Sequence, residues 1–240
     1  MSVIELSTRE LHDLLAPVLP HASTDRTLPE LGVIRVEVRD GILYAIATDR
    51  YTMAATRHRL QESTADTEIA IGVADAAALM KVFKYTQKDD PWLTLAVGKV
   101  EAETVLDPAD RPALTVTAKD GNTLVLNGRE ALPLASWRTY IGKAIHREQQ
   151  PVNPNLALTL TLMSRWLKAT RNGAWLTFSI GAGKRDTVLV RAGDHFIGIW
   201  APITWRREFD LTDSPWCKEL PPEVESGAAA QSEQKQEATR

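Results

Sequence analysis

Basic side chains recur at helical spacing in two segments of the sequence. Residues three and four positions apart lie on one face of a helix, so each segment would present a row of positive charge. Such a row can contact nucleic-acid phosphates weakly, without regard to base sequence and with strong salt dependence. For either row alone a solvated helix face is the better explanation, but two such rows in equivalent positions of a repeat favour a binding surface. The first row is Lys81, Lys84 and Lys88, and the second is Arg165, Lys168 and Arg171.

A third, weaker basic region lies near the N-terminus. Arg9 and His12 fall on one predicted helix. Glu10 and Asp13 on the same helix dilute their charge, and Arg26 follows in the next loop. We therefore include Arg9 and Arg26 among the candidate phosphate contacts.

Sequence patterns typical of enzymes are absent. Residues 181–185 resemble part of a phosphate-binding loop, but Phe178 stands where the first glycine belongs and a predicted strand follows instead of a helix. The five histidines lack metal-ligand spacing, and no G-x-S-x-G motif occurs. We predict no catalytic residues, no metal site and no cofactor. A binding protein is favoured over an enzyme.

The composition is that of a soluble globular protein. The 240 residues are 44% hydrophobic and 25% charged, and the net charge is −3. Residues 207–240 hold eight acidic and four basic residues, so the rest of the chain is nearly neutral. That balance excludes a uniformly basic nucleic-acid-binding protein but permits a local basic face. The last residues lack large apolar side chains, and we expect them to be disordered.

The sequence also gives expectations about cellular location. No apolar run is long enough to cross a bilayer, and the N-terminus lacks the pattern of a signal peptide. The single cysteine, Cys217, cannot form an intramolecular disulfide. We expect a cytoplasmic protein that does not contact a membrane.

The predicted elements indicate an α+β fold. Ser7 and Glu10 form the S-x-x-E pattern of a capping box at a helix start. Asp40-Gly41 is a hairpin turn signal between two alternating segments. Glycine-containing pairs at 98–99, 120–121 and 172–173 are also expected to end elements. The predicted helices span 7–18, 75–85 and 162–171, and the predicted strands span 34–38, 42–47, 53–56, 68–72, 92–97, 100–106, 113–118, 123–126, 156–160, 175–180, 187–191 and 196–200.

A strand–helix–strands order therefore occurs three times. It predicts antiparallel sheets with a few helices packed on one face. The stretch QQPVNPN at 149–155 is expected to be a linker, and a helix over 137–145 is the one candidate for a fourth module.

Four short segments occur in the order of a known family. The first two are TLPELGV at 27–33 and IATDRYTMA at 46–54. The third joins LNGRE at 126–130 to SWR at 136–138, and the fourth is AGDHFIGIWAPI at 192–203. Together they resemble the bacterial DNA polymerase III β sliding clamp family over residues 1–205.

This resemblance implies the DNA-clamp (processivity) fold, a ring of repeated modules with sheets outside and helices lining a central hole. Basic residues on the inner helices would touch duplex DNA loosely, while the ring tethers a replicative polymerase. The DNA-binding residues so implied are Arg9, Arg26, Lys81, Lys84, Lys88, Arg165, Lys168 and Arg171.

The family also has a hydrophobic pocket that binds short peptide motifs of polymerases and clamp loaders. Leu31, Met53 and Ile199 are each explained equally well as core residues. Carried over position by position, the pocket comprises Leu31, Thr48, Arg50, Tyr51, Thr52, Met53, Thr139, Tyr140, Ile199, Pro202 and Ile203.

Several positions depart from the family pattern. Arg50 replaces a glycine, Tyr51-Thr52 replaces a His-Arg pair and Ala201 replaces a methionine. Leu134-Ala135 replaces a Phe-Pro pair. These changes would alter the shape of the pocket and its peptide preference.

The chain is shorter than the three-domain family. We expect a clamp domain over 1–145, like the family's middle domain, a partial clamp domain over 154–206, and an acidic tail over 207–240. A half-domain leaves an open sheet edge, which favours a homo-oligomer of three or four chains. The alternative is a monomeric clamp-like regulator or decoy that binds clamp, polymerase or loader peptides without encircling DNA. An enzyme with an unrecognised site is a third, weaker possibility.

Overall fold

A computed structural model shows the fold of the N-terminal compact unit, Met1–Thr204; the chain's second unit is Trp205–Arg240. Everything said below about helices, strands, contacts and absences refers to the described residues of the first unit. These are 2–62, 65–86, 88–100, 111–131, 137–146, 149–150, 160–170, 175–181 and 187–201.

The smaller sheet has four antiparallel strands in the order β1-β6-β7-β8. They are β1 (Ser2–Ser7), β6 (Trp92–Val100), β7 (Arg111–Ala118) and β8 (Thr123–Asn127). The N-terminal strand pairs with β6 along its whole length, with Ile4 opposite Leu95. Consequently the chain's first residues are tied to a segment about ninety positions later.

The larger sheet has eight antiparallel strands in the order β5-β2-β3-β4-β12-β11-β10-β9. Its central pairing, β4 with β12, joins the N-terminal half of the unit to its C-terminal part, and Met53 lies opposite Ile199. The strands are β2 (Val33–Arg39), β3 (Ile42–Thr48), β4 (Thr52–Arg59), β5 (Thr67–Gly72), β9 (Gln149–Gln150), β10 (Leu176–Gly181), β11 (Val188–Ala192) and β12 (Phe196–Trp200).

Helix α1 (Thr8–Leu15) begins with the predicted capping box. The Ser7 hydroxyl accepts from the Glu10 N–H, and a Glu10 carboxylate oxygen accepts from the Ser7 N–H. Each bond satisfies a backbone N–H group that would be unpaired at the start of the helix. Leu11 and Leu14 then point into the core.

Helix α2 (Val73–Val82) ends three residues earlier than the sequence predicts. Phe83 leaves helical geometry and is buried, and its carbonyl accepts a hydrogen bond from His12 Nε2 at 2.8 Å. A contact with α1 therefore ends the helix. Lys84 and Lys88 lie beyond it, so the expected three-lysine helix face is not formed.

The helix predicted over 162–171 is also corrected. The chain forms one α-helical turn, α4 (Leu160–Met163), and continues as the 3-10 helix η3 (Ser164–Ala169). Trp166 and Ala169 are both fully buried. A 3-10 helix has three residues per turn, so it brings these two side chains to the same side.

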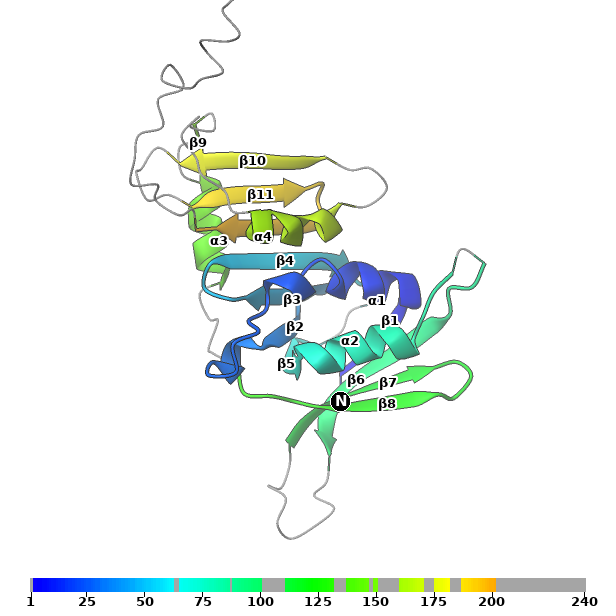
Figure 1. The fold of residues 1–240 in the computed structure, drawn as a ribbon. Coiled ribbons are helices and arrows are strands. Elements are labelled where there is room, and N and C mark those ends of the chain that lie inside the picture. Colours follow the sequence, from blue (N-terminus) through cyan, green and yellow to red (C-terminus); the bar gives the residue numbers. More distant parts are fainter. Residues whose placement is uncertain are drawn as a thin grey trace, which may run out of the picture. The chain divides into compact units, whose positions relative to one another are not determined.

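The eight-stranded sheet is covered on both faces. Alternate residues of β3, β4 and β12 divide into two clusters, because successive side chains in a strand point to opposite faces. One face packs against α1, α2 and η3 in a core shared with the smaller sheet. The other packs against a fourth helix, α3 (Trp137–His146), which Figure 1 shows on the far side of the strands from α4.

The fold class is therefore as predicted, with one correction: the helices do not all lie on one face. Several boundaries also differ. The strand β1 was not predicted, although Ile4 and Leu6 alternate with polar residues. The turn expected at 98–99 is wrong, because β6 runs through it and pairs Gly98 with Ala113.

The element end expected at 172–173 and the disorder expected for the last residues lie wholly outside the described residues, and three other expectations lie partly outside them. The predicted strand over 100–106 retains only Val100, which ends β6. The predicted strand over 156–160 retains only Leu160, which begins α4. Two residues of the expected linker, Gln149 and Gln150, pair with β10 as a short strand.

Two short 3-10 helices complete the unit. The first, η1 (Leu19–His21), places the His21 ring in the core, and the second, η2 (Pro29–Leu31), leads into β2. The hairpin turn predicted at Asp40-Gly41 is confirmed, since both residues have positive φ, at 53° and 71°.

Candidate functional site

The turn between β3 and β4 is tightly hydrogen-bonded. Asp49 Oδ1 accepts from the Tyr51 N–H at 3.1 Å, from the Thr52 N–H at 2.8 Å and from the Thr52 hydroxyl at 3.0 Å. The Thr48 hydroxyl donates to the Thr52 carbonyl at 2.8 Å. The loop is thus held by its own side chains, and its Tyr51 carbonyl accepts from the Ala201 N–H just after β12.

Arg50 occupies a strained position in this turn. Its φ is 78°, in the left-handed region that glycine adopts without steric cost. Glycine would suit this position, as expected from the family that the sequence resembles. In this chain an exposed cationic side chain occupies the tip of the loop instead.

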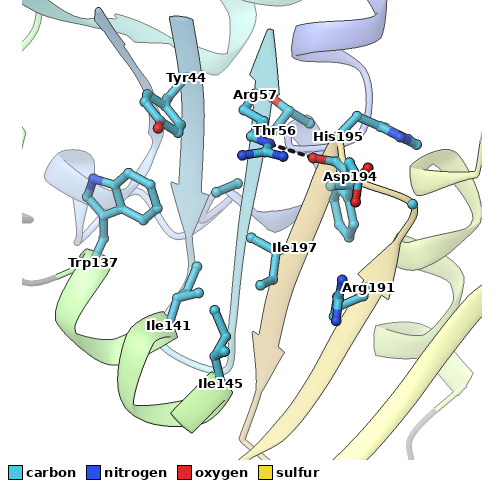
Figure 2. Close-up of a pocket in the computed structure, with 13 residues that line it drawn as sticks. Tyr44, Thr56, Arg57, Trp137, Ile141, Ile145, Arg191, Asp194, His195 and Ile197 are labelled. Atoms are coloured by element: carbon cyan, nitrogen blue, oxygen red, sulfur yellow. Dashed lines mark hydrogen bonds between the residues drawn. The ribbon is translucent and has the colours of Figure 1, made fainter. Parts of the chain in front are cut away.

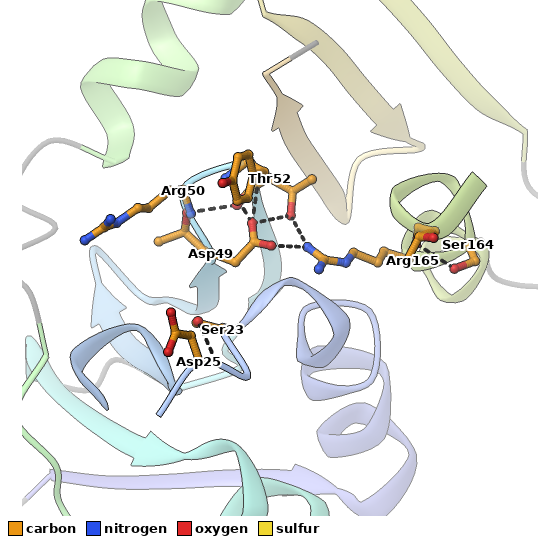
Figure 3. A network of polar contacts seen from close by, with 10 residues as sticks. Ser23, Asp25, Asp49, Arg50, Thr52, Ser164 and Arg165 are labelled. Atoms are coloured by element: carbon orange, nitrogen blue, oxygen red, sulfur yellow. Dashed lines mark hydrogen bonds and ion pairs between the residues drawn. The ribbon is translucent and has the colours of Figure 1, made fainter. Parts of the chain in front are cut away.

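Arg165 connects η3 to the same turn (Figure 3). One of its guanidinium nitrogens, Nη1, forms an ion pair with Asp49 Oδ2 and also donates to the Thr52 hydroxyl at 3.0 Å. Burial raises the pKa of Asp49, but the hydrogen bonds from Arg165 and Thr52 outweigh it and hold that pKa below its ordinary value. The carboxylate is therefore charged at neutral pH.

A buried aromatic cluster lies beneath this ion pair. The His21 ring is 4.3 Å from the ring of Trp166, which in turn is 6.2 Å from the ring of Trp200. Burial, reinforced by the nearby Arg165 charge and opposed by Asp49, lowers the pKa of His21 from 6.5 to about 3. Among the described residues, neither ring nitrogen of His21 has a hydrogen-bond partner. The imidazole is neutral at physiological pH.

On the other sheet face, α3 is anchored by a buried acid. The Glu37 carboxylate accepts from the Trp137 indole N–H at 3.2 Å and from Arg138 Nη1 at 2.8 Å. The Arg138 guanidinium also lies 4.8 Å above the Tyr44 ring. These contacts hold the first turn of α3 over β2 and β3. One turn later, Ile141 packs in the same apolar cluster as Met53.

A cavity of about 320 Å³ opens beside α3 (Figure 2). Its apolar part is formed by Trp137, Ile141 and Ile197, while Arg57 and Arg191 bring positive charge to its rim. Arg57 Nε donates to the Asp194 carbonyl at 2.6 Å, which holds the β11–β12 hairpin against β4. Sequence reasoning did not single out these residues, because they are distant in sequence and only β-pairing brings them together.

The predicted peptide-site residues lie around this face but not in that cavity. Met53 and Ile199 are cross-strand neighbours and pack under α3. Thr139 and Tyr140 are exposed on α3. Of the eleven residues, those within the described part of the chain are all absent from the lining of the cavity beside α3.

The other members of that set are more dispersed. Leu31 and Thr48 line a small crevice next to Ile46. The remaining turn residues differ in exposure: Arg50 and Tyr51 are exposed, and Thr52 is buried. Pro202 and Ile203 lie outside the described residues.

The predicted phosphate contacts are mostly exposed. Arg165 is the exception, because it is partly buried and bonded to Asp49. Arg171 lies outside the described residues. The exposed cations are Arg9 on α1, Arg26 in the loop before η2, Lys81 on α2, Lys84 and Lys88 after α2, and Lys168 on η3.

The fold is similar to that of solved bacterial DNA polymerase III β subunits. The Thermotoga maritima structure matches with a TM-score of 0.62 and 13% identity, over 93% of this chain and 68% of that one. The DNA polymerase sliding clamp of Bacillus subtilis matches with a TM-score of 0.59 and 16% identity, over 86% and 64%. The β chain of Streptococcus pneumoniae gives 0.58 and 12%, over 85% and 65%.

The chain has the sliding-clamp fold. It spans about two thirds of the length of the clamps that it matches. At these identities the likeness concerns the fold alone. No protein-family model matches the sequence, and no curated protein does.

Neither a metal site nor a membrane span is found in the described part of the chain. Within those ranges, no group of histidine, cysteine, aspartate and glutamate side chains could hold a metal ion. No helix in the same residues is long and apolar enough to traverse a lipid bilayer.

Proposed function

We propose that this protein is a DNA sliding clamp, a processivity factor without enzymatic activity. It encircles duplex DNA as a homo-oligomeric ring and tethers a replicative polymerase through short peptide motifs. It acts in the cytoplasm and uses no cofactor. The fold shared with solved sliding clamps is the observation that carries the proposal.

The helix-covered side of the unit supports the DNA part of the proposal. Helices α1 and α2 lie side by side, and η3 covers the same face of the large sheet. Arg9, Lys81 and Lys168 are exposed on these three elements. A few cations on a nearly neutral body give weak, sequence-independent contacts, which allow a ring to slide.

The opposite side supports the peptide part. The β3–β4 turn presents Arg50 and Tyr51 to solvent, and Tyr140 is exposed on the neighbouring helix α3. An exposed aromatic side chain beside a rigid turn is a suitable anchor for a short peptide. Arg50 in place of glycine and the packing of α3 over Met53 give this surface a shape of its own.

Subunit number is open to direct measurement. Native mass spectrometry and sedimentation velocity over a hundredfold range of concentration are expected to show one closed species of three or four chains. A ring closes at a defined number, because each interface fixes the rotation between neighbours. A monomer at all concentrations would contradict the ring.

The second candidate is a monomeric clamp-like regulator or decoy that binds clamp, polymerase or loader peptides. The shortness of the chain relative to the matched clamps favours it. It predicts a stable monomer that binds such peptides in calorimetry and shows no topological retention on DNA. Failure to bind any clamp subunit or clamp-binding peptide would exclude it.

A further inference from the structure

One end of strand β4 has an edge that no described residue covers. Strand β12 pairs with β4 from Thr52 to Thr56, and the Arg57 N–H donates to the His195 carbonyl at 2.9 Å. Strand β4 continues to Arg59, and over His58–Arg59 no described residue pairs with it on the β12 side. The Arg57 N–H points to the β12 side of the strand. Because backbone groups two residues apart in a strand point to the same side, the N–H and carbonyl of Arg59 also point to this edge.

Two hollows meet at that edge. The apolar cavity beside α3 has Trp137 and Ile197 in its lining. A second hollow of about 340 Å³ is lined by the basic end of β4 and by Asp194. The two share Arg57, Asp194 and His195. An apolar cavity therefore continues directly into a basic one.

The charge of this region is unbalanced. Arg57, Arg59 and Arg191 are exposed, and no ion pair joins any of them to a carboxylate within the described residues. Asp194 is the acidic residue in the lining of either hollow. An incoming negative charge would meet two or three guanidinium groups, which bind carboxylates with matched geometry.

We propose that this end of β4 binds an extended acidic peptide segment of a partner protein. The peptide backbone adds to the open edge of β4, one apolar side chain enters the cavity against Ile141 and Ile197, and neighbouring carboxylates meet Arg59 and Arg191. Strand addition gives affinity through main-chain hydrogen bonds, while the cavity and the charges give specificity. The site lies at the opposite end of β4 from the Thr48–Thr52 turn, so it is separate from the peptide surface proposed above.

The probe is a fluorescein-labelled eight-residue peptide with a central Ile-Leu pair between two Asp-Glu pairs. Its matched control carries Asn and Gln in place of the acids. Fluorescence polarisation is measured with the full chain at about 50 mM and about 200 mM salt, since screening weakens exposed ion pairs. We expect the acidic peptide to bind at least roughly fivefold more tightly than the neutral peptide, and salt to reduce the difference.

Three variants locate the site. Arg59→Gln with Arg191→Gln is expected to weaken the acidic peptide roughly fivefold or more, and Ile145→Glu, at the exposed cavity wall, to weaken both peptides. Lys119→Gln, which removes an exposed cation just after β7 on the smaller sheet, is the control and leaves binding unchanged. All are checked for native circular dichroism and melting temperature.

Three outcomes would overturn the proposal: no binding of the acidic peptide, equal binding of the two peptides, or full binding by the Arg59/Arg191 double variant. The double variant is also tested for retention on DNA, where no change is expected. Loss of peptide binding with intact retention, or the reverse, separates this proposal from the sliding-clamp proposal.

Discussion

Acidification from pH 7 to pH 5 is expected to destabilise the fold through one side chain, His21. Its ring is fully buried against Trp166 and Phe196, and within the described ranges neither ring nitrogen has a partner that could share a proton. The charged groups that face it are Arg165, which disfavours an imidazolium, and Asp49, which is already paired with Arg165. Protonation would therefore place an uncompensated charge in the core.

The magnitude follows from the shift in pKa. The pKa of His21 is about 3 in the folded chain and 6.5 when unfolded, so the unfolded state binds more protons between these values. Stability is complete above pH 6.5 and is lost as the pH falls toward 3. The free energy of unfolding falls by about 1.4 kcal/mol per pH unit once the pH is below 6.5, and it changes little above that value. The loss between pH 7 and pH 5 is therefore about 2 kcal/mol, which is a large share of a typical domain's stability.

Urea unfolding followed by tryptophan fluorescence measures this loss. Wild type is compared with His21→Leu, which keeps an apolar side chain of similar size and cannot titrate. The other four histidines, His12, His58, His146 and His195, are present in both proteins, so the difference between their pH profiles isolates His21.

The free energy of unfolding of wild type is expected to fall by about 2 kcal/mol more than that of the variant between pH 7 and pH 5. Profiles that differ by less than about 0.5 kcal/mol would refute the reasoning, because they would mean that the imidazole can be protonated in the folded chain. A smaller slope of the unfolding free energy against urea concentration in either protein would indicate a change in the unfolding transition. The two proteins would then be compared at the urea concentrations of their unfolding midpoints.

Three further predictions concern other residues. Arg50→Gly is expected to stabilise the chain by about 1 kcal/mol in thermal unfolding, because it removes a side chain from a φ of 78°; an unchanged or lower melting temperature would contradict the strain. Gly198→Ala is expected to cost about 2 to 3 kcal/mol, since its Cβ would lie 2.5 Å from the Trp166 ring and 2.8 Å from a carbonyl of β4; a neutral effect in urea unfolding would mean that Trp166 is not seated as described. The double variant Lys81→Glu with Lys168→Glu is expected to bind duplex DNA more weakly. The slope of log K against log salt concentration is expected to become shallower by about one for each phosphate that is no longer neutralised. Equal slopes for variant and wild type would place these lysines away from DNA.

Local signals in the sequence predicted several elements well. The capping box of Ser7 and Glu10 starts α1 as expected, and the Asp40-Gly41 turn joins β2 and β3. The last strand of the unit, β12, has the predicted bounds. These features depend on interactions within a few residues, so a short window of sequence contains the whole cause.

Elements fixed by distant contacts were harder to predict. The end of α2 depends on the bond from His12 to the Phe83 carbonyl, seventy-one positions away in sequence. Gly98 remains in β6 because β7 pairs with that strand past this residue, with Gly98 opposite Ala113. Neither cause appears in the local pattern.

The candidate site shows the same division. Resemblance to the clamp family led to the Thr48–Thr52 turn, and the structure explains why glycine suits position 50. It gave no indication that Arg165 is bonded to Asp49, because a basic residue at helical spacing has the same pattern whether it is free or paired. The cavity beside α3 depends on Glu37 anchoring that helix, which no sequence motif marks.

The most direct test of the sliding-clamp proposal is topological retention on duplex DNA. A linear duplex is fixed to a bead at one end, the protein is allowed to thread over the free end, and that end is then blocked with a bulky bound protein before a high-salt wash. High salt removes ordinary phosphate contacts but cannot release a closed ring. We therefore expect the protein to stay on the blocked duplex and to be washed from the open one. Equal release from both duplexes, with the protein native and loaded at the same concentration, would contradict the proposal.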